Sequence, residues 1–195
     1  EPRPRGDRAA RVQGLALDRR AGRALGLQRP LLYEKTPYGY RVVPNQDLLR
    51  FGNRVFYNNE GLRSGPIAAA PPPGVERILC VGDSITNGGT PTDQRDTYPY
   101  LLEQRLRTDG IRAEVLNASA GGWALENAEG WLRVNGMLNA RIVILEVATH
   151  DLFQPFAAGD IVGRHPSFPD RLPVLAIQEL WVRYLGPRLA HTNVE

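Results

Sequence analysis

An alternation of strand and helix patterns, beginning near residue 75, constrains the fold more than any other feature of this sequence. Nearly continuous apolar runs are typical of strands covered on both faces. We expect three such strands, at residues 77–82, 113–117 and 141–147. Apolar side chains at helical spacing predict three helices, at residues 97–108, 124–138 and 173–185. This alternation predicts an α/β fold built from βαβ units, with a parallel sheet between two layers of helices.

The part of the chain before residue 75 has a different texture. Residues 1–30 are rich in Arg, Ala and Gly and predict a loose basic arm with one short helix. Aromatic and β-branched residues at 38–43 and 50–57 predict short strands. A Pro/Ala-rich linker follows at residues 66–74. We therefore divide the chain into a small β-rich N-terminal extension, residues 1–74, and an α/β domain, residues 75–195.

The composition is that of an ordinary globular protein, with 42% apolar and 23% charged residues in 195. It excludes a collagen, a coiled coil and a wholly disordered chain. No apolar run approaches the roughly 20 residues that span a bilayer, and no apolar segment of a signal peptide follows the first residues of the sequence. We therefore expect no stable membrane insertion. The start at Glu1, without an initiator Met, is typical of a trimmed mature end and favours a periplasmic or secreted location.

Charge is distributed unevenly along the chain. Residues 1–65 carry 13 basic against 6 acidic side chains, whereas residues 66–195 carry 11 against 15. All basic residues except Lys35 are Arg, which is typical of a codon bias, so we expect no nucleic-acid partner. The basic arm is either a solvated segment or a contact for an acidic polymer or an anionic lipid. The single cysteine, Cys80, lies in an apolar run and is expected to be a buried small hydrophobe.

Small and polar residues follow each of the three predicted strands. The clusters are residues 82–88, residues 117–123 and residues 148–151. Because the carboxyl ends of parallel strands meet at one edge of a sheet, we expect these three clusters to lie together. Ligands bind at that edge in open α/β sheets, so the sequence places the functional site there.

The three clusters resemble the sequence blocks of the GDSL family of SGNH hydrolases. The first reads Gly-Asp-Ser-Ile-Thr at residues 82–86, the second Asn-Ala-Ser-Ala-Gly-Gly at 117–122, and the third ends in His150-Asp151. The segment at residues 58–63 also resembles one that precedes the first block in bacterial members. The resemblance implies a three-layer, doubly wound, flavodoxin-like sheet and a hydrolase that acts on esters.

The resemblance also implies roles for individual residues. Ser84 is the nucleophile, and the backbone N–H groups of Ser84 and Gly122, together with the side chain of His150, hold the oxyanion. A serine hydroxyl needs a base, and the oxyanion that forms on attack needs preorganised donors. Three neighbouring residues are expected to contact substrate: Asp83, Asn87 and Asp151.

This sequence departs from the family pattern in two places. His150 stands where the third block has Asn; it either donates a hydrogen bond to the oxyanion or only packs and caps. The Asp-x-x-His block that supplies the family's base is absent, and His165 and His191 lie in polar segments. Three strands are also fewer than the roughly five of a flavodoxin-like sheet. We therefore expect an incomplete fold whose base and remaining strands follow residue 195, with a degenerate pseudoenzyme as the alternative.

No phosphate-binding glycine motif and no cluster with metal-ligand spacing occurs in the sequence. We therefore expect neither a cofactor nor a metal. The favoured function is hydrolysis of a small-molecule or carbohydrate ester through an acyl-serine intermediate, with a carbohydrate O-acetyl ester as the leading substrate. The alternatives are an O-acyltransferase that acts on a polysaccharide and a non-catalytic carbohydrate-binding module with the same fold. The sequence leaves the oligomeric state open.

Overall fold

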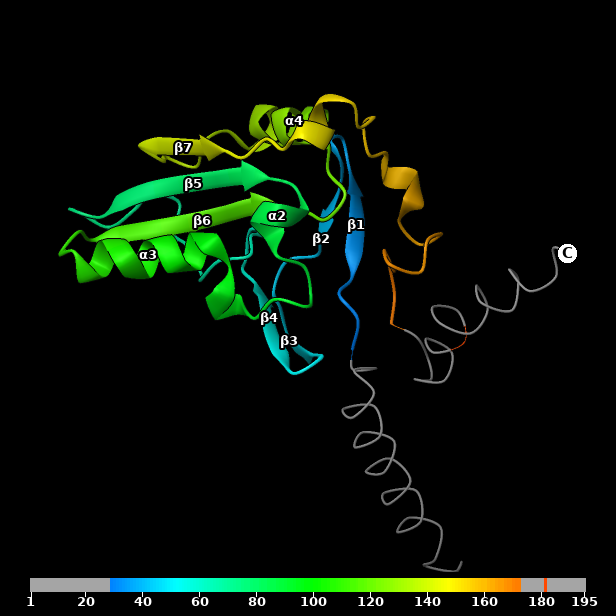
Figure 1. Cartoon of the computed structure of the whole chain (residues 1–195), viewed down its shortest axis with the longest axis horizontal. Helices are drawn as coiled ribbons and strands as arrows, with labels where there is room; N and C mark the ends of the chain where they lie inside the picture. The colour runs from blue at the N-terminus through cyan, green and yellow to red at the C-terminus, as the bar shows by residue number, and fades with distance from the viewer. Residues whose placement is uncertain (1–28, 173–180, 182–195) are drawn as a thin grey trace, which may run out of the picture.

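A computed structural model of the chain describes residues 29–172 and residue 181. The predicted arm at 1–28, most of the predicted helix at 173–185, and His191 lie outside the described residues. The centre of the molecule is a parallel sheet of three strands: β5 (Glu76–Gly82), β6 (Ala113–Ser119) and β7 (Ile142–Leu145). Their order is β6-β5-β7, with β5 in the middle (Figure 1). This is the order of the first three strands of a flavodoxin-like sheet, as predicted.

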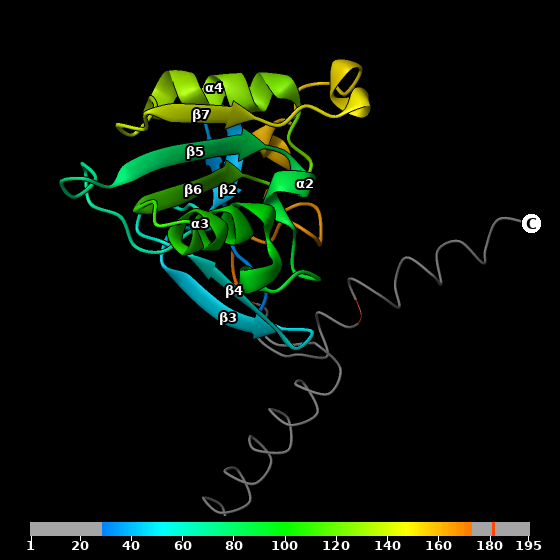
Figure 2. The same cartoon turned by 60° about the vertical axis from the view of Figure 1, so that its left-hand side comes forward.

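Two helices cover the opposite faces of the sheet: α3 (Tyr98–Thr108) and α4 (Leu125–Asn135) (Figures 1 and 2). Successive side chains of β5 point to opposite faces. Ile78 and Cys80 pack on the side of α3, whereas Leu79 and Val81 pack with Trp131 on the side of α4. This alternation explains the continuous apolar run, because both faces of the strand are buried. The predicted three-layer α/β arrangement is confirmed.

Strand β7 is shorter than the predicted strand at 141–147 and forms one edge of the sheet. It pairs with β5 on one side, and no other described strand pairs with it. Ile142 and Leu145 are therefore 49% and 46% exposed, although the sequence pattern suggested a fully covered strand. Within the described residues the doubly wound sheet is incomplete, as expected.

The N-terminal extension forms two antiparallel hairpins. The first joins β1 (Tyr33–Thr36) to β2 (Gly39–Val42), and the second joins β3 (Gln46–Arg50) to β4 (Asn53–Tyr57). The prediction of one strand over residues 50–57 is wrong, because Phe51 and Gly52 both have positive φ and reverse the chain. Strands β1 and β3 were missed because more than half of their residues are polar or charged.

The first hairpin packs against the carboxyl end of the parallel sheet, as Figure 1 shows. Tyr38 and Tyr40 share a core with Trp123, whose indole N–H donates to the Tyr40 carbonyl at 2.9 Å. The linker at 66–74 is held by the buried guanidinium of Arg77, which donates to the Ala68 carbonyl at 2.8 Å and pairs with Glu114 at 2.8 Å. The division of the chain at residue 74 stays a prediction.

Four short helical turns complete the described part: α2 (Ser84–Asn87), η1 (Gln94–Asp96), η2 (Thr149–Leu152) and η3 (Gly159–Ile161). Among the described helices, none combines the length and the apolar character that a membrane span requires.

Candidate active site at the carboxyl edge of the sheet

The segments that follow the three parallel strands meet at one edge of the sheet, as the sequence predicted. Helix α2 follows β5, a glycine turn at 121–122 follows β6, and helix η2 follows β7 (Figure 1). Hydrogen bonds join each pair of these segments. The bonded pairs are Asn87 with Ser119, His150 with Asp83, and Gln154 with Gly122.

The turn from β5 into α2 determines where Ser84 points. Asp83 is buried and caps α2, because its Oδ1 accepts the N–H of Ile85 at 2.7 Å. A Cβ on Gly82 would lie 2.2 Å from Thr86 Oγ1, so only glycine fits before the cap. The next residue, Ser84, is exposed, and its hydroxyl makes no hydrogen bond to any described residue. A nucleophile needs this combination of a fixed backbone and an accessible hydroxyl.

Hydrogen bonds from two buried asparagine side chains hold α2 in place. The Asn87 amide donates to the Tyr57 hydroxyl and to the Ser119 carbonyl, both at 2.9 Å. Asn117 donates to the Thr86 carbonyl at 2.8 Å. Asn87 is only 3% exposed, so these contacts make it an anchor of the helix. Its predicted contact with substrate stays a prediction.

A buried arginine, Arg63, fixes the loop that follows α2. Its guanidinium donates to the carbonyl of Asn87 at 2.7 Å, to that of Thr92 at 2.6 Å, and also to that of Gly89. Burial lowers the pKa of Arg63 from its ordinary value. The place of Arg63 in the segment at 58–63, which resembles family members, indicates that it matters, but no sequence pattern indicates its hydrogen-bond partners.

The turn at Gly122 supplies the expected backbone donor. Gly122 has φ +82°, and its N–H makes no hydrogen bond to any described residue. Two side chains hold the turn: the Tyr40 hydroxyl donates to the Gly121 carbonyl, and the Gln154 amide donates to the Gly122 carbonyl, each at 2.8 Å. Sequence analysis missed both side chains, because each comes from a segment without a motif.

His150 lies between two buried carboxylates. Its Nε2 is 2.9 Å from Asp83 Oδ2 and 3.4 Å from Asp151 Oδ1. Because an ionised carboxylate only accepts, Nε2–H donates to Asp83, and Nδ1 of the neutral ring is then an acceptor. Donation from His150 to an oxyanion therefore requires either a doubly protonated ring or a ring whose proton is on Nδ1.

Glu146, at the end of β7, adds a third carboxylate to this cluster. Burial raises its pKa, and so do a hydrogen bond shared with Asp83 and the charges of Asp83 and Asp151. Its Oε2 also accepts a bond from Thr86 Oγ1 at 3.4 Å. Sequence analysis missed Glu146, although it lies four residues before His150 in the third block.

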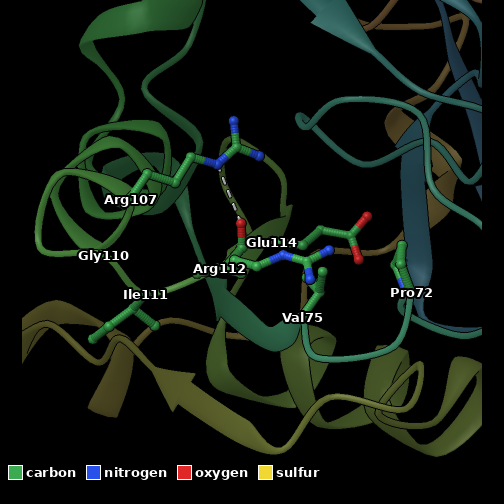
Figure 3. Close-up of a pocket in the computed structure, with 8 residues that line it drawn as sticks. Pro72, Val75, Arg107, Gly110, Ile111, Arg112 and Glu114 are labelled. Atoms are coloured by element: carbon green, nitrogen blue, oxygen red, sulfur yellow. Dashed lines mark hydrogen bonds between the residues drawn. The ribbon is translucent and has the colours of Figure 1, made fainter.

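Two cavities lined by described residues are candidate substrate sites. One of about 240 Å³ lies beside the motif residues and is lined in part by Asn87, Thr90 and Gly121. A larger one of about 490 Å³ lies at the opposite, amino end of β5 and β6, between Val75 and the side chains of Arg107 and Arg112 (Figure 3). We favour the smaller cavity, because ligands of open α/β sheets bind at the carboxyl ends of the strands.

The predicted site residues thus fall into two groups. Four of them lie together: Asp83, Ser84, His150 and Asp151. Asn87 lies in helix α2 with Ser84, and Gly122 accepts a hydrogen bond from Gln154, whose own N–H donates to the His150 carbonyl. The catalytic and substrate-binding roles of all six stay predictions.

Comparisons with known proteins agree with the family resemblance of the three sequence blocks. Residues 80–192, more than half of the chain, match the GDSL-like Lipase/Acylhydrolase family. The crystal structure of AlinE4, a SGNH-hydrolase family esterase, is 27% identical with a TM-score of 0.37; the similarity covers 43% of this chain and 45% of that one. No curated protein matches the chain. The chain belongs to the GDSL-like lipase/acylhydrolase family.

Proposed function

We propose that the protein hydrolyses carboxylic esters through an acyl intermediate on Ser84. The observation that carries this proposal is the placement of Ser84, which is exposed at the carboxyl end of a buried central strand and carries a hydroxyl without a described partner. Membership of an acylhydrolase family supports ester hydrolysis in general.

In the proposed reaction, Ser84 Oγ transfers its proton to a general base and attacks the ester carbonyl carbon. The protonated base then returns this proton to the leaving alcohol. The oxyanion that forms accepts hydrogen bonds from the N–H of Gly122 and from the backbone at Ser84, with His150 as a further donor. Collapse of the tetrahedral intermediate breaks the carbon–oxygen bond to the alcohol, which leaves with a proton. Water then attacks the acyl-serine and releases the carboxylic acid.

The acyl group is proposed to be short, as in an O-acetyl ester of a carbohydrate. The cavity beside the motif residues measures about 240 Å³, below the roughly 300–1,000 Å³ typical of sites for larger ligands. Aromatic rings of Tyr33 and Phe168 line it together with the polar side chains of Asn87 and Thr90, which suits a small substrate of mixed polarity.

Substitution of the nucleophile tests the proposal. Ser84→Ala should lower kcat for p-nitrophenyl acetate by about 10³-fold or more, because the acyl intermediate can no longer form. Thr108→Ala removes an exposed hydroxyl at the far end of α3 and serves as the control, with activity near that of the unmodified protein. Equal turnover by Ser84→Ala and by the control would refute the proposal. A sugar alcohol added as acceptor would distinguish acyl transfer from hydrolysis.

A further inference from the structure

We propose that Asp83, His150 and Asp151 bind a divalent cation of the group from Mn²⁺ to Zn²⁺. Each of the three residues offers one ligand atom, and these atoms all lie within 4.8 Å of one another. Asp83 comes from the end of β5, and the other two come from η2, so the fold itself brings the three together. The site is adjacent to Ser84, but the inference does not depend on ester hydrolysis.

The spacing of the ligand atoms already suits a metal ion. His150 Nε2 lies 2.9 Å from Asp83 Oδ2 and 3.4 Å from Asp151 Oδ1. Ligands at about 2.1 Å from a cation are about 3.0 Å apart along an octahedral edge and about 3.4 Å apart along a tetrahedral one. The two distances from His150 therefore match those between ligands of one cation, which would replace the proton between His150 and Asp83, while the two carboxylates would move to complete the site.

A second, independent observation is a carboxylate oxygen of Asp151 that makes no hydrogen bond. Asp151 Oδ1 is buried and makes no hydrogen bond to any described residue, while Oδ2 accepts the N–H of Ala148 at 2.7 Å. The Asp151 side chain is only 4% exposed, and Oδ1 faces His150. A buried carboxylate oxygen without a hydrogen bond is costly, and a bound cation would satisfy it.

Charge and ligand chemistry narrow the choice of cation. Asp83 and Asp151 present two carboxylates to one imidazole, and Glu146 shares a hydrogen bond with Asp83, so acidic groups outnumber basic ones in a cluster that a divalent cation would neutralise. An imidazole ligand disfavours Mg²⁺ and Ca²⁺, which prefer oxygen, and suits the transition metals and Zn²⁺. The His150 side chain is 54% exposed, which leaves space for water or substrate oxygen in the remaining coordination positions.

A cation bound at this site would also change the hydrogen bonding of His150. A cation bound to Nε2 places the ring proton on Nδ1, so the neutral imidazole becomes a donor on that side. This is the tautomer that donation to an oxyanion by a neutral ring requires.

Metal binding by the tag-free protein tests the inference directly. After treatment with EDTA and removal of the chelator, titration calorimetry with Zn²⁺ should show one site with a Kd of about 10 µM or below. Zn²⁺ at about 100 times Kd should raise the Tm by about 5–10 °C. Asp151→Asn and His150→Gln should each weaken Zn²⁺ binding at least about tenfold, since even residues outside the ligand shell contribute that much.

Matched variants control for folding and for surface binding. His165→Gln and Asp96→Asn remove an exposed imidazole and an exposed carboxylate elsewhere and should leave the Kd unchanged. The Tm of each variant in EDTA checks its fold, and Asp151→Asn keeps an oxygen for the Ala148 N–H. Three results would overturn the inference: no Zn²⁺ binding by the folded protein, equal binding by ligand and control variants, or Mg²⁺ and Ca²⁺ binding as tightly as Zn²⁺.

Discussion

Gly82 and Asp83 decide how Ser84 is presented, and they do so through space and hydrogen bonding rather than through charge. A Cβ at Gly82 would collide with Thr86 and approach Glu146 Oε2 to 2.9 Å. The Asp83 carboxylate caps α2 and also accepts from His150. Gly82 and Asp83 therefore build the turn that carries Ser84, the proposed nucleophile.

Gly122 allows a prediction at the same scale. Gly122→Ala should lower the free energy of unfolding by about 1–2 kcal/mol, because the Cβ of alanine is strained at the positive φ of this residue. The added Cβ would also lie 3.0 Å from the Tyr40 hydroxyl, which holds the turn, so kcat for p-nitrophenyl acetate should fall. Urea denaturation and steady-state kinetics measure the two effects.

Gly110→Ala is the matched control for this change. Gly110 has φ +81°, nearly the same as Gly122, but a Cβ there would meet no atom within 4 Å. It should have a similar conformational cost without loss of kcat. A Gly122→Ala protein with undiminished kcat would show that this turn does not hold the oxyanion.

Among the elements of the fold, the strands whose two faces are both buried were predictable from the sequence. Strands β5 and β6 are apolar because helices cover both faces, and α3 and α4 show helical spacing for the same reason. The hairpins were harder, since the reversal at Phe51-Gly52 depends on backbone conformation and β1 and β3 are largely polar. Long-range side-chain contacts such as those of Arg63 leave no local pattern at all.

The loop after α2 depends on one element of the N-terminal extension, the segment that ends in Arg63. Arg63→Met should lower the free energy of unfolding by about 2–4 kcal/mol, because the carbonyls of Asn87, Gly89 and Thr92 lose their shared donor. Arg54→Met removes an exposed arginine paired with Asp47 and should change it by less than about 1 kcal/mol. Equal denaturation midpoints for the two variants would contradict the anchoring role.

At the scale of the whole molecule, the N-terminal hairpin and the parallel sheet share one core, so the site rests on contacts between distant parts of the chain. Tyr40 is 81 residues from Gly121, yet its hydroxyl holds the turn. The order of the strands and the convergence of the three motif segments were predictable, because parallel topology requires them. The contacts of the extension with the site were not, since no local pattern encodes such pairings.

The reactivity of the Cys80 thiol measures whether the core around the central sheet is closed. It is fully buried in the central strand, and burial raises the pKa of its thiol to about 11. At pH 8 the folded protein should therefore not react with a disulfide reagent that detects thiolates, whereas the protein unfolded in guanidinium should react with one equivalent. Rapid reaction of the folded protein at the rate of a free thiol would show that the sheet opens easily and would contradict the packed core.

Covalent capture of Ser84 tests the central claim most directly. A fluorophosphonate ester should form a single adduct with the folded full-length protein, in which the expected base is present, by displacement of fluoride by Ser84 Oγ. Peptide mass spectrometry should locate the adduct on the peptide that contains Ser84. Ser84→Ala should give no adduct, and Thr108→Ala should be labelled like the unmodified protein. Absence of labelling in protein shown to be folded, or an adduct on another residue with Ser84 unmodified, would contradict the assignment of Ser84 as the nucleophile.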